Sequence, residues 1–203
     1  PLIKLGFSEF GITTDMTGSK MLFAGIRFTI SGLIVLFMAQ ATRKSLHVKG
    51  FAGWGYVIAF ALVNTTFHYA CFYIGLSHSQ GARAAILNSS GVFILVLLAC
   101  LCFKSDKLTL RKSAGCAIGF AGVMALNIGG GDSGSLTLLG DGMILLNALC
   151  SAFAGLMTRG LSRYVDIFAG TGYSLAIGGI LLILPSLLIG GTLPAVTWAG
   201  ILI

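Results

Sequence analysis

Polar side chains that could bind a small molecule are few in this sequence, and several stand inside long apolar runs. Asn64, His68, Cys71 and Gly75 recur at helical spacing, so they share one face of a helix. Such a face is costly in lipid and should turn toward neighbouring helices. His68 could titrate near neutral pH, and it could therefore carry a proton, contact a bound molecule or serve as a structural hydrogen-bond partner.

An aromatic residue and a cation extend this set. Tyr69, beside the stripe, could offer its ring to an aromatic or cationic solute, or it could simply pack. Arg27 lies about a third of the way into an earlier apolar run, where a cationic side chain is costly. It could attract an anionic group such as a carboxylate, extend toward the membrane surface, or pair with Glu9 or Asp15 in the preceding segment.

Two later runs carry further candidates. Asn88 is the first of three consecutive polar residues, which cannot all face one way, and it is predicted to meet a cavity or a neighbouring helix. Asn147 and Ser151 belong to a stripe of small and polar residues that a solute pathway and helix packing explain equally well. Tyr173 matches Phe28 in an internal similarity described below. The candidate pathway residues are Arg27, Asn64, His68, Tyr69, Asn88, Asn147, Ser151 and Tyr173.

The acidic residues are placed where they cannot act at the centre of a membrane. All six lie in loops or at the ends of apolar runs: Glu9, Asp15, Asp106, Asp132, Asp141 and Asp166. Phosphate-binding and metal-binding patterns are absent from the sequence, and the five cysteines all stand in apolar runs without ligand spacing. We therefore predict no catalytic residue, no metal site and no cofactor.

The elements that must position these residues are membrane helices. Of the 203 residues, 56% are hydrophobic and only 9% are charged, whereas soluble domains carry roughly 25% charged residues. This composition excludes a soluble enzyme, a nucleic-acid-binding protein and a disordered chain. The net charge of +7 comes from basic residues in short loops between apolar runs, so we expect a lipid bilayer as partner and no nucleic acid.

Six apolar runs are predicted as complete helical spans, of which the fourth is short and could extend into Ile128 and the glycines after it. They cover residues 21–40, 53–75, 82–103, 113–127, 139–158 and 168–189, and residues 1–7 and 195–203 look like parts of two more. The segments 41–52, 104–112 and 159–167 should share one side of the membrane, and together they hold nine of the 13 basic residues. The positive-inside rule places that side in the cytoplasm.

An internal repeat indicates how two of the spans are oriented relative to each other. Residues 23–31 (FAGIRFTIS) resemble residues 168–176 (FAGTGYSLA), and residues 2–8 resemble residues 156–162. The copies are five spans apart, an odd number, so the second copy crosses the membrane in the opposite direction. Inverted repeats of this kind are typical of secondary transporters, in which the solute site lies near the middle of the membrane.

Several motifs resemble those of the drug/metabolite transporter superfamily, in its EamA-type ten-helix group. They are Ala24-Gly25-Ile26-Arg27-Phe28, the run ARAAIL at 82–87, Asp106-Lys107-Leu108-Thr109 followed by Gly115, and Gly140-Asp141-Gly142. Two positions depart from the family pattern. Gly91 stands where the family usually has a proline in the middle of a helix, and Asp106 replaces a glutamate.

The resemblance implies an all-helical integral membrane fold of two inverted five-helix repeats. Residues 1–131 would form the first repeat, without most of its first helix, and residues 132–203 the start of the second. It also implies secondary transport of small organic metabolites by alternating access, in the cell membrane of a bacterium, with export of amino acids or related metabolites as the leading expectation.

Alternatives stay open. Uptake or exchange of a sugar, a vitamin or a nucleotide-sugar is a second form of transport, and a membrane scaffold without transport activity is a different class of function. An intramembrane enzyme would need paired catalytic groups at one depth, and the sequence offers no such pair. The Gly115, Gly119 and Gly122 face could pack within the bundle or in a homodimer.

Overall fold

The computed structural model describes residues 16–79, 81–103, 109–127 and 138–192. Every regular element in these ranges is helical, which confirms the predicted all-helical class. The elements are α2 (Thr17–Ala41), α3 (Gly50–Ala61), the π-helix η1 (Leu62–Phe67), α4 (His68–His78), α5 (Gly81–Cys102), α6 (Leu110–Asn127), α7 (Leu138–Leu161) and α8 (Ile167–Leu188). The partial spans predicted at 1–7 and 195–203, and the repeat boundary at 131–132, lie outside these ranges.

Within the described ranges, five helices are long and apolar enough to cross a membrane. Four of them are α2, α5 from Arg83, α7 and α8. The fifth is the 29-residue helix Gly50–His78, in which α3, the π-helix η1 and α4 follow one another without a break. Their ends lie within a few residues of the predicted spans. The remaining predicted span corresponds to α6, which has 18 residues, carries Arg111 and Lys112 in its first turn and is not among the five. The chain is a multi-pass membrane protein.

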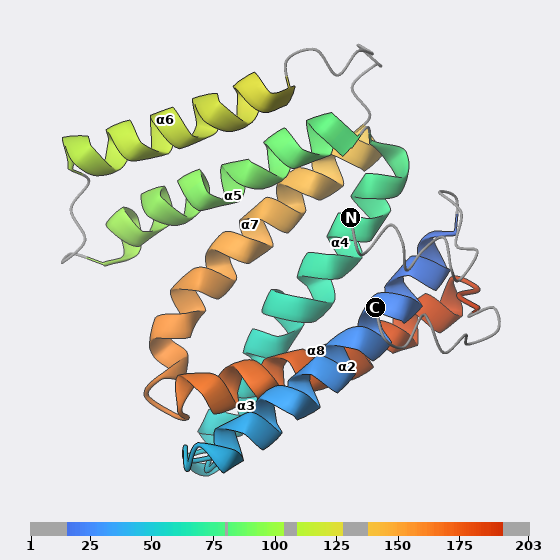
Figure 1. The fold of residues 1–203 in the computed structure, drawn as a ribbon, viewed down its shortest axis with the longest axis vertical. Coiled ribbons are helices and arrows are strands. Elements are labelled where there is room, and N and C mark those ends of the chain that lie inside the picture. The colour runs from blue at the N-terminus through green and yellow to red at the C-terminus, as the bar shows by residue number, and fades with distance from the viewer. Residues whose placement is uncertain (1–15, 80, 104–108, 128–137, 193–203) are drawn as a thin grey trace.

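Glycines bring α2 and α8 into backbone contact, and Figure 1 shows the two helices side by side. A Cβ atom on Gly25 would lie 2.8 Å from Ile183 Cγ1 and 2.9 Å from the Gly179 carbonyl oxygen, and one on Gly179 would lie 2.7 Å from the Gly25 oxygen. Gly18 meets Ser186 at one end of the contact, and Gly32 meets the backbone of Gly172 at the other. The helices are therefore antiparallel, with small residues replacing the side chains that would hold them apart.

Contacts at the helix ends define two sides of the bundle. On one side the Lys49 amide donates to the Tyr164 carbonyl at 2.9 Å, which joins the α2–α3 link to the α7–α8 link. On the other side Thr17 Oγ1 donates to Ser77 Oγ at 2.8 Å and the Thr192 amide donates to Ser19 Oγ at 3.3 Å. These pairings agree with the predicted sharing of one side by residues 41–52 and 159–167.

Helices α5 and α6 form the periphery of the bundle (Figure 1). Helix α5 packs along α7, where the buried Gly91 would place a Cβ 3.1 Å from the Ala148 carbonyl oxygen. Gly91 thus allows α5 and α7 to approach closely. Helix α6 has α5 as its principal neighbour, and most of its described side chains are exposed.

Candidate functional site

The π-helix η1 lies in the middle of the Gly50–His78 span and directs its polar residues toward two different helices. Its wider turn breaks the regular α-helical spacing, and single π turns are frequent at functional sites. Although helical spacing put Asn64 and His68 on one face, Asn64 contacts α8 and His68 contacts α7. We call the group of Asn64, Thr65, Thr66, His68, Asn88, Asn147 and Ser174 the polar centre.

The α8 side of the polar centre is a set of hydroxyl and amide hydrogen bonds. Asn64 Nδ2 donates to Ser174 Oγ at 3.1 Å, and Thr65 Oγ1 donates to the Ser174 carbonyl at 3.2 Å. Thr66 Oγ1 donates to the Gly178 carbonyl at 3.0 Å. Thr65 and Ser174 are completely buried, and a Cβ on Gly178 would collide with Thr65. A glycine is needed there for η1 to reach the α8 backbone.

The α7 side holds the histidine and two asparagines. His68 Nδ1 lies 3.3 Å from the Asn147 carbonyl oxygen; because a carbonyl only accepts, Nδ1 is inferred to carry the hydrogen, which leaves Nε2 of the neutral ring as an acceptor. Asn147 Nδ2 donates to Asn88 Oδ1 at 2.6 Å. The Asn147 side chain is fully buried, and its Oδ1 has no hydrogen-bond partner in the part of the chain that the structure describes.

Aromatic rings flank the polar centre on the α2 side. The Tyr69 ring lies 4.7 Å from the His68 ring, edge to face, and 4.2 Å from the Phe28 ring, centroid to centroid. The Arg27 guanidinium carbon lies 5.3 Å from the Phe28 centroid, within the range of a cation–π contact. These rings connect the cation to the polar centre. Glu9 and Asp15, the partners considered for Arg27, lie outside the described residues.

The structure brings some candidate residues together and leaves others apart. Hydrogen bonds join His68 and Asn88 to Asn147 on the α7 side of the polar centre, and Asn64 to Ser174 on its α8 side. Tyr69 packs edge to face against His68, and Arg27 reaches Tyr69 through the Phe28 ring. Ser151 is exposed on α7. The Tyr173 hydroxyl donates to the Leu46 carbonyl at 3.1 Å near the α2–α3 link, with its ring against Trp54.

Sequence reasoning missed Thr66 and Ser174 as members of the polar centre. A sequence does not distinguish a hydroxyl side chain that bonds to another helix from one that bonds to a carbonyl of its own helix. Ser89 and Ser90 illustrate the second case, since both donate to carbonyls three residues earlier on α5. The one available signal was the place of Ser174 in the segment that matches residues 23–31.

A charged contact lies at the opposite end of α4 from η1. Asp141, in the first turn of α7, accepts from Ser79 Oγ at 2.7 Å and from Arg83 Nη1 at 3.3 Å. This pairing fastens the α4–α5 turn to the start of α7. Asp141 lies at a helix end, as the sequence predicted for every acidic residue.

The polar centre offers neutral hydrogen-bonding groups and one histidine. Among the described residues that were searched, no group of three His, Cys, Asp or Glu side chains could hold a metal ion. The arrangement suits recognition of a polar molecule through hydrogen bonds, with aromatic and cationic surfaces beside it.

Membrane-length helices around a buried polar centre define a multi-pass membrane protein with a hydrophilic interior. Residues 13–128 match the EamA-like transporter family, over more than half of the chain, and the chain belongs to that family. The family comprises transporters rather than enzymes, in agreement with the absence of catalytic motifs from the sequence.

Named relatives are longer than this chain. It is 26% identical, over 77% of its length and 38% of the relative's, to the WAT1-related protein At3g02690, chloroplastic, of Arabidopsis thaliana. It is 28% identical to the uncharacterized transporter YvbV of Bacillus subtilis, over 81% of its length and 52% of the relative's. The uncharacterized transporter sll0355 of Synechocystis is 24% identical, with 84% and 55% covered. The chain thus spans about half the length of these relatives or less, and no solved structure matches it.

Proposed function

We propose that the intact protein is a secondary transporter that moves small organic metabolites across the cell membrane by alternating access, with amino acids or related metabolites as its exported solutes. The observation that carries this proposal is the polar centre. Four helical elements (η1 with the start of α4, α5, α7 and α8) contribute side chains to it in the middle of an otherwise apolar bundle. Ionisable and polar groups at this depth are expensive in lipid and usually mark a solute or ion path.

The chemistry of the groups supports an amino-acid-like solute. The unsatisfied Asn147 Oδ1 suits a hydrogen-bond donor such as an ammonium group. Arg27 suits a carboxylate, and the Phe28 and Tyr69 rings between them suit an apolar or aromatic body. A zwitterion with a side chain presents all three features together.

Contacts at both ends of the bundle support alternating access. At the end predicted to be cytoplasmic, Tyr56 Oη donates to the Met157 carbonyl at 2.9 Å and Lys49 bonds Tyr164. At the other end Arg83 and Ser79 hold Asp141. Opening one set while the other stays closed would expose the polar centre to one side at a time.

The test is solute flux through the intact protein reconstituted in proteoliposomes, with and without an imposed pH gradient. The labelled solutes would be amino acids, a sugar, a vitamin and a nucleotide-sugar. We expect His68→Ala and Asn88→Ala to reduce amino-acid flux at unchanged protein insertion, and Thr171→Ala, an exposed α8 position, to leave it unchanged.

Three outcomes would contradict the proposal. Wild-type flux in both polar-centre variants would remove these residues from the pathway. Flux of only a sugar, vitamin or nucleotide-sugar would replace the proposed solute class. A well-inserted protein that moves none of the solutes would favour the scaffold alternative.

A further inference from the structure

An open groove runs between α5 and α6. It lies on the side of α5 that faces away from α7. Its volume is about 500 Å³. Helix α5 lines it with Ser89, Val92, Phe93 and Val96, and α6 lines it with Arg111, Lys112, Gly115, Cys116, Gly119 and Phe120. Apart from the two cations and Ser89, these residues present apolar or small surfaces.

The apolar walls of this groove are exposed in the part of the chain that the structure describes. Val92 is 65% exposed and Phe93 42% exposed. Cβ atoms built on Gly115 and Gly119 would meet nothing within 4 Å. In a membrane chain such a surface contacts hydrocarbon, and a flexible acyl chain can follow the space that the two glycines leave open.

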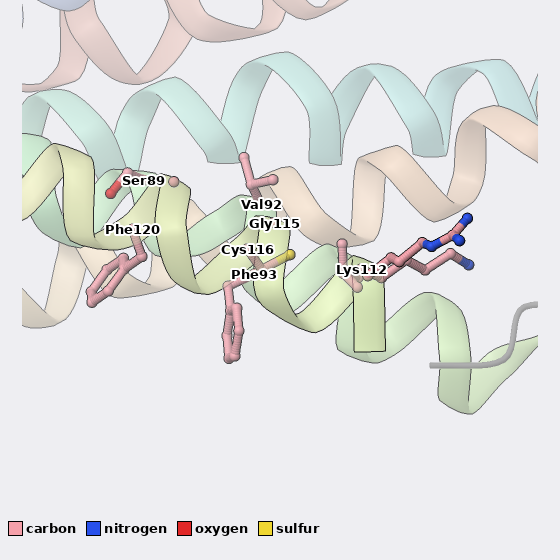
Figure 2. Close-up of a pocket in the computed structure, with 10 residues that line it drawn as sticks. Ser89, Val92, Phe93, Lys112, Gly115, Cys116 and Phe120 are labelled. Carbon is pink, nitrogen blue, oxygen red and sulfur yellow. The ribbon is translucent and has the colours of Figure 1, made fainter. Parts of the chain in front are cut away.

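The cations gather at one end of the groove. Arg111 and Lys112 belong to the first turn of α6, and Figure 2 shows the Lys112 side chain directed away from Phe93 and Phe120. A second groove of about 360 Å³ shares Val96 and Lys112 with the first and adds Arg159 from the last turn of α7. Three cationic side chains from two helices therefore border one end, which the positive-inside rule places in the cytoplasm.

We propose that this groove binds an anionic phospholipid of the cytoplasmic leaflet, with an acyl chain between α5 and α6 and the phosphate beside Arg111 and Lys112. An apolar groove that ends in cations has the polarity of such a lipid, and basic pockets between membrane helices on the cytoplasmic side favour anionic headgroups. The proposal is independent of the transported solute.

The test is lipid binding by the intact protein in nanodiscs of phosphatidylcholine with a small fraction of phosphatidylglycerol, read by native mass spectrometry after release. The wild type should retain phosphatidylglycerol in preference to phosphatidylcholine. We expect about a fivefold loss of that preference in Arg111→Gln, and more in the double variant with Lys112→Gln. Arg43→Gln and Lys44→Gln remove cations from the same side of the membrane, away from the groove, and should leave the preference unchanged.

A second variant separates the acyl-chain site from general charge attraction. Gly119→Leu fills the groove without changing charge, so it should displace both lipids from the tightly bound fraction. Equal retention of the two lipids by the wild type would overturn the proposal, and so would unchanged preference in Arg111→Gln. A disulfide formed by Gly119→Cys with a cysteine of a second copy, or of another helix of the same chain, would show that protein occupies the groove instead.

Discussion

The carboxamide of Asn147 is completely buried. Its Nδ2 atom donates one hydrogen bond, to Asn88, and its Oδ1 atom has no partner among the described residues. In a low-dielectric interior an unmatched polar atom costs free energy, and its persistence is a common property of functional sites. The bond to Asn88 fixes the rotation of the Asn147 amide, because Asn147 Nδ2 is held by Asn88 Oδ1. The Asn147 Oδ1 atom must then point away from Asn88. The pair therefore sets the orientation of an available acceptor.

The coupling between these two asparagines can be measured. We expect Asn88→Ala to lower the thermal unfolding temperature of the intact protein in detergent, because it leaves both polar ends of the buried Asn147 amide unmatched. Asn147→Ala alone should be less harmful, since Asn88 is exposed. A double-mutant cycle on the free energy of unfolding should give a coupling of about 0.6 kcal/mol, the average for hydrogen bonds between membrane helices, and at most about 1.7 kcal/mol.

A coupling near zero would show that the 2.6 Å contact contributes nothing to stability and that Asn88 serves another purpose. Ser89→Ala provides the matched control on α5. Its hydroxyl bonds within its own helix, so its effect should add independently to that of Asn147→Ala.

At this scale, sequence alone identified the asparagines and the histidine but not their partners. The argument that three consecutive polar residues cannot share a face singled out Asn88, which is the one of the three that reaches another helix. The contact of Asn64 with Ser174, and that of Thr66 with the Gly178 carbonyl, required knowledge of helix packing, because each joins residues about 110 positions apart.

The π-helix is the element on which the polar centre depends. A π turn contains one more residue than the α turn it replaces, so η1 sets the rotation of everything after it in the span. With η1 in place, Asn64 reaches α8 while His68, one turn later, reaches α7. A regular helix would direct both toward the same neighbour.

Removing one residue from η1 tests this role. Deletion of Val63, a half-buried residue of the element, should restore a regular α-helix and turn Asn64 and His68 toward the same neighbouring helix. We expect the deletion to abolish solute flux in proteoliposomes while the protein still inserts. Val63→Ala keeps the chain length and should retain most of the flux; full flux in the deletion variant would show that the π turn is dispensable.

Hydrophobic periodicity could not have revealed this element. Periodicity assumes one helical repeat, and on that assumption residues 64, 68, 71 and 75 form a single stripe. The excess length of the span, 29 residues where about 20 suffice, is the one feature that hints at an irregular turn.

The α2–α8 contact gives a second prediction at the level of elements. Gly25→Ala places a methyl group 2.8 Å from Ile183 Cγ1 and 2.9 Å from a backbone oxygen, whereas Gly115→Ala meets nothing within 4 Å. Both changes favour the helix by up to about 1 kcal/mol, but crowding at Gly25 should cost about 1–3 kcal/mol. Thermal unfolding in detergent should therefore fall for Gly25→Ala and not for Gly115→Ala; the reverse order would contradict the backbone contact.

For the whole molecule, the prediction concerns which ends of the helices share a side of the membrane. In a version of the intact protein with its cysteines replaced, Lys44→Cys and Lys112→Cys should react with a membrane-impermeant thiol reagent only when the cytoplasmic face is accessible. Thr192→Cys, beside Ser19, should react from the opposite face. Labelling of the Lys44 and Lys112 positions from different faces would break the predicted threading.

Composition and run length were enough to predict the class of protein and most helix bounds. The run predicted at 139–158, for example, is the core of α7, Leu138–Leu161. Run length placed the start of α6 three residues too late, because the apolar stretch that begins at residue 113 leaves out the two cations in the first turn of the helix. The inverted repeat and its boundary stay predictions, since they depend on regions outside the described residues.

The glycine-lined contact of α2 with α8 also has a consequence for how the protein is made. Gly25 and Gly179 are about 150 residues apart, so at ribosomal speeds of about 5–20 residues per second α2 enters the bilayer roughly ten to thirty seconds before its partner exists. During that interval the bare backbone groove of α2 faces lipid or an insertion factor. The early helix must therefore persist in the membrane before the partner that fills its glycine-lined face is made.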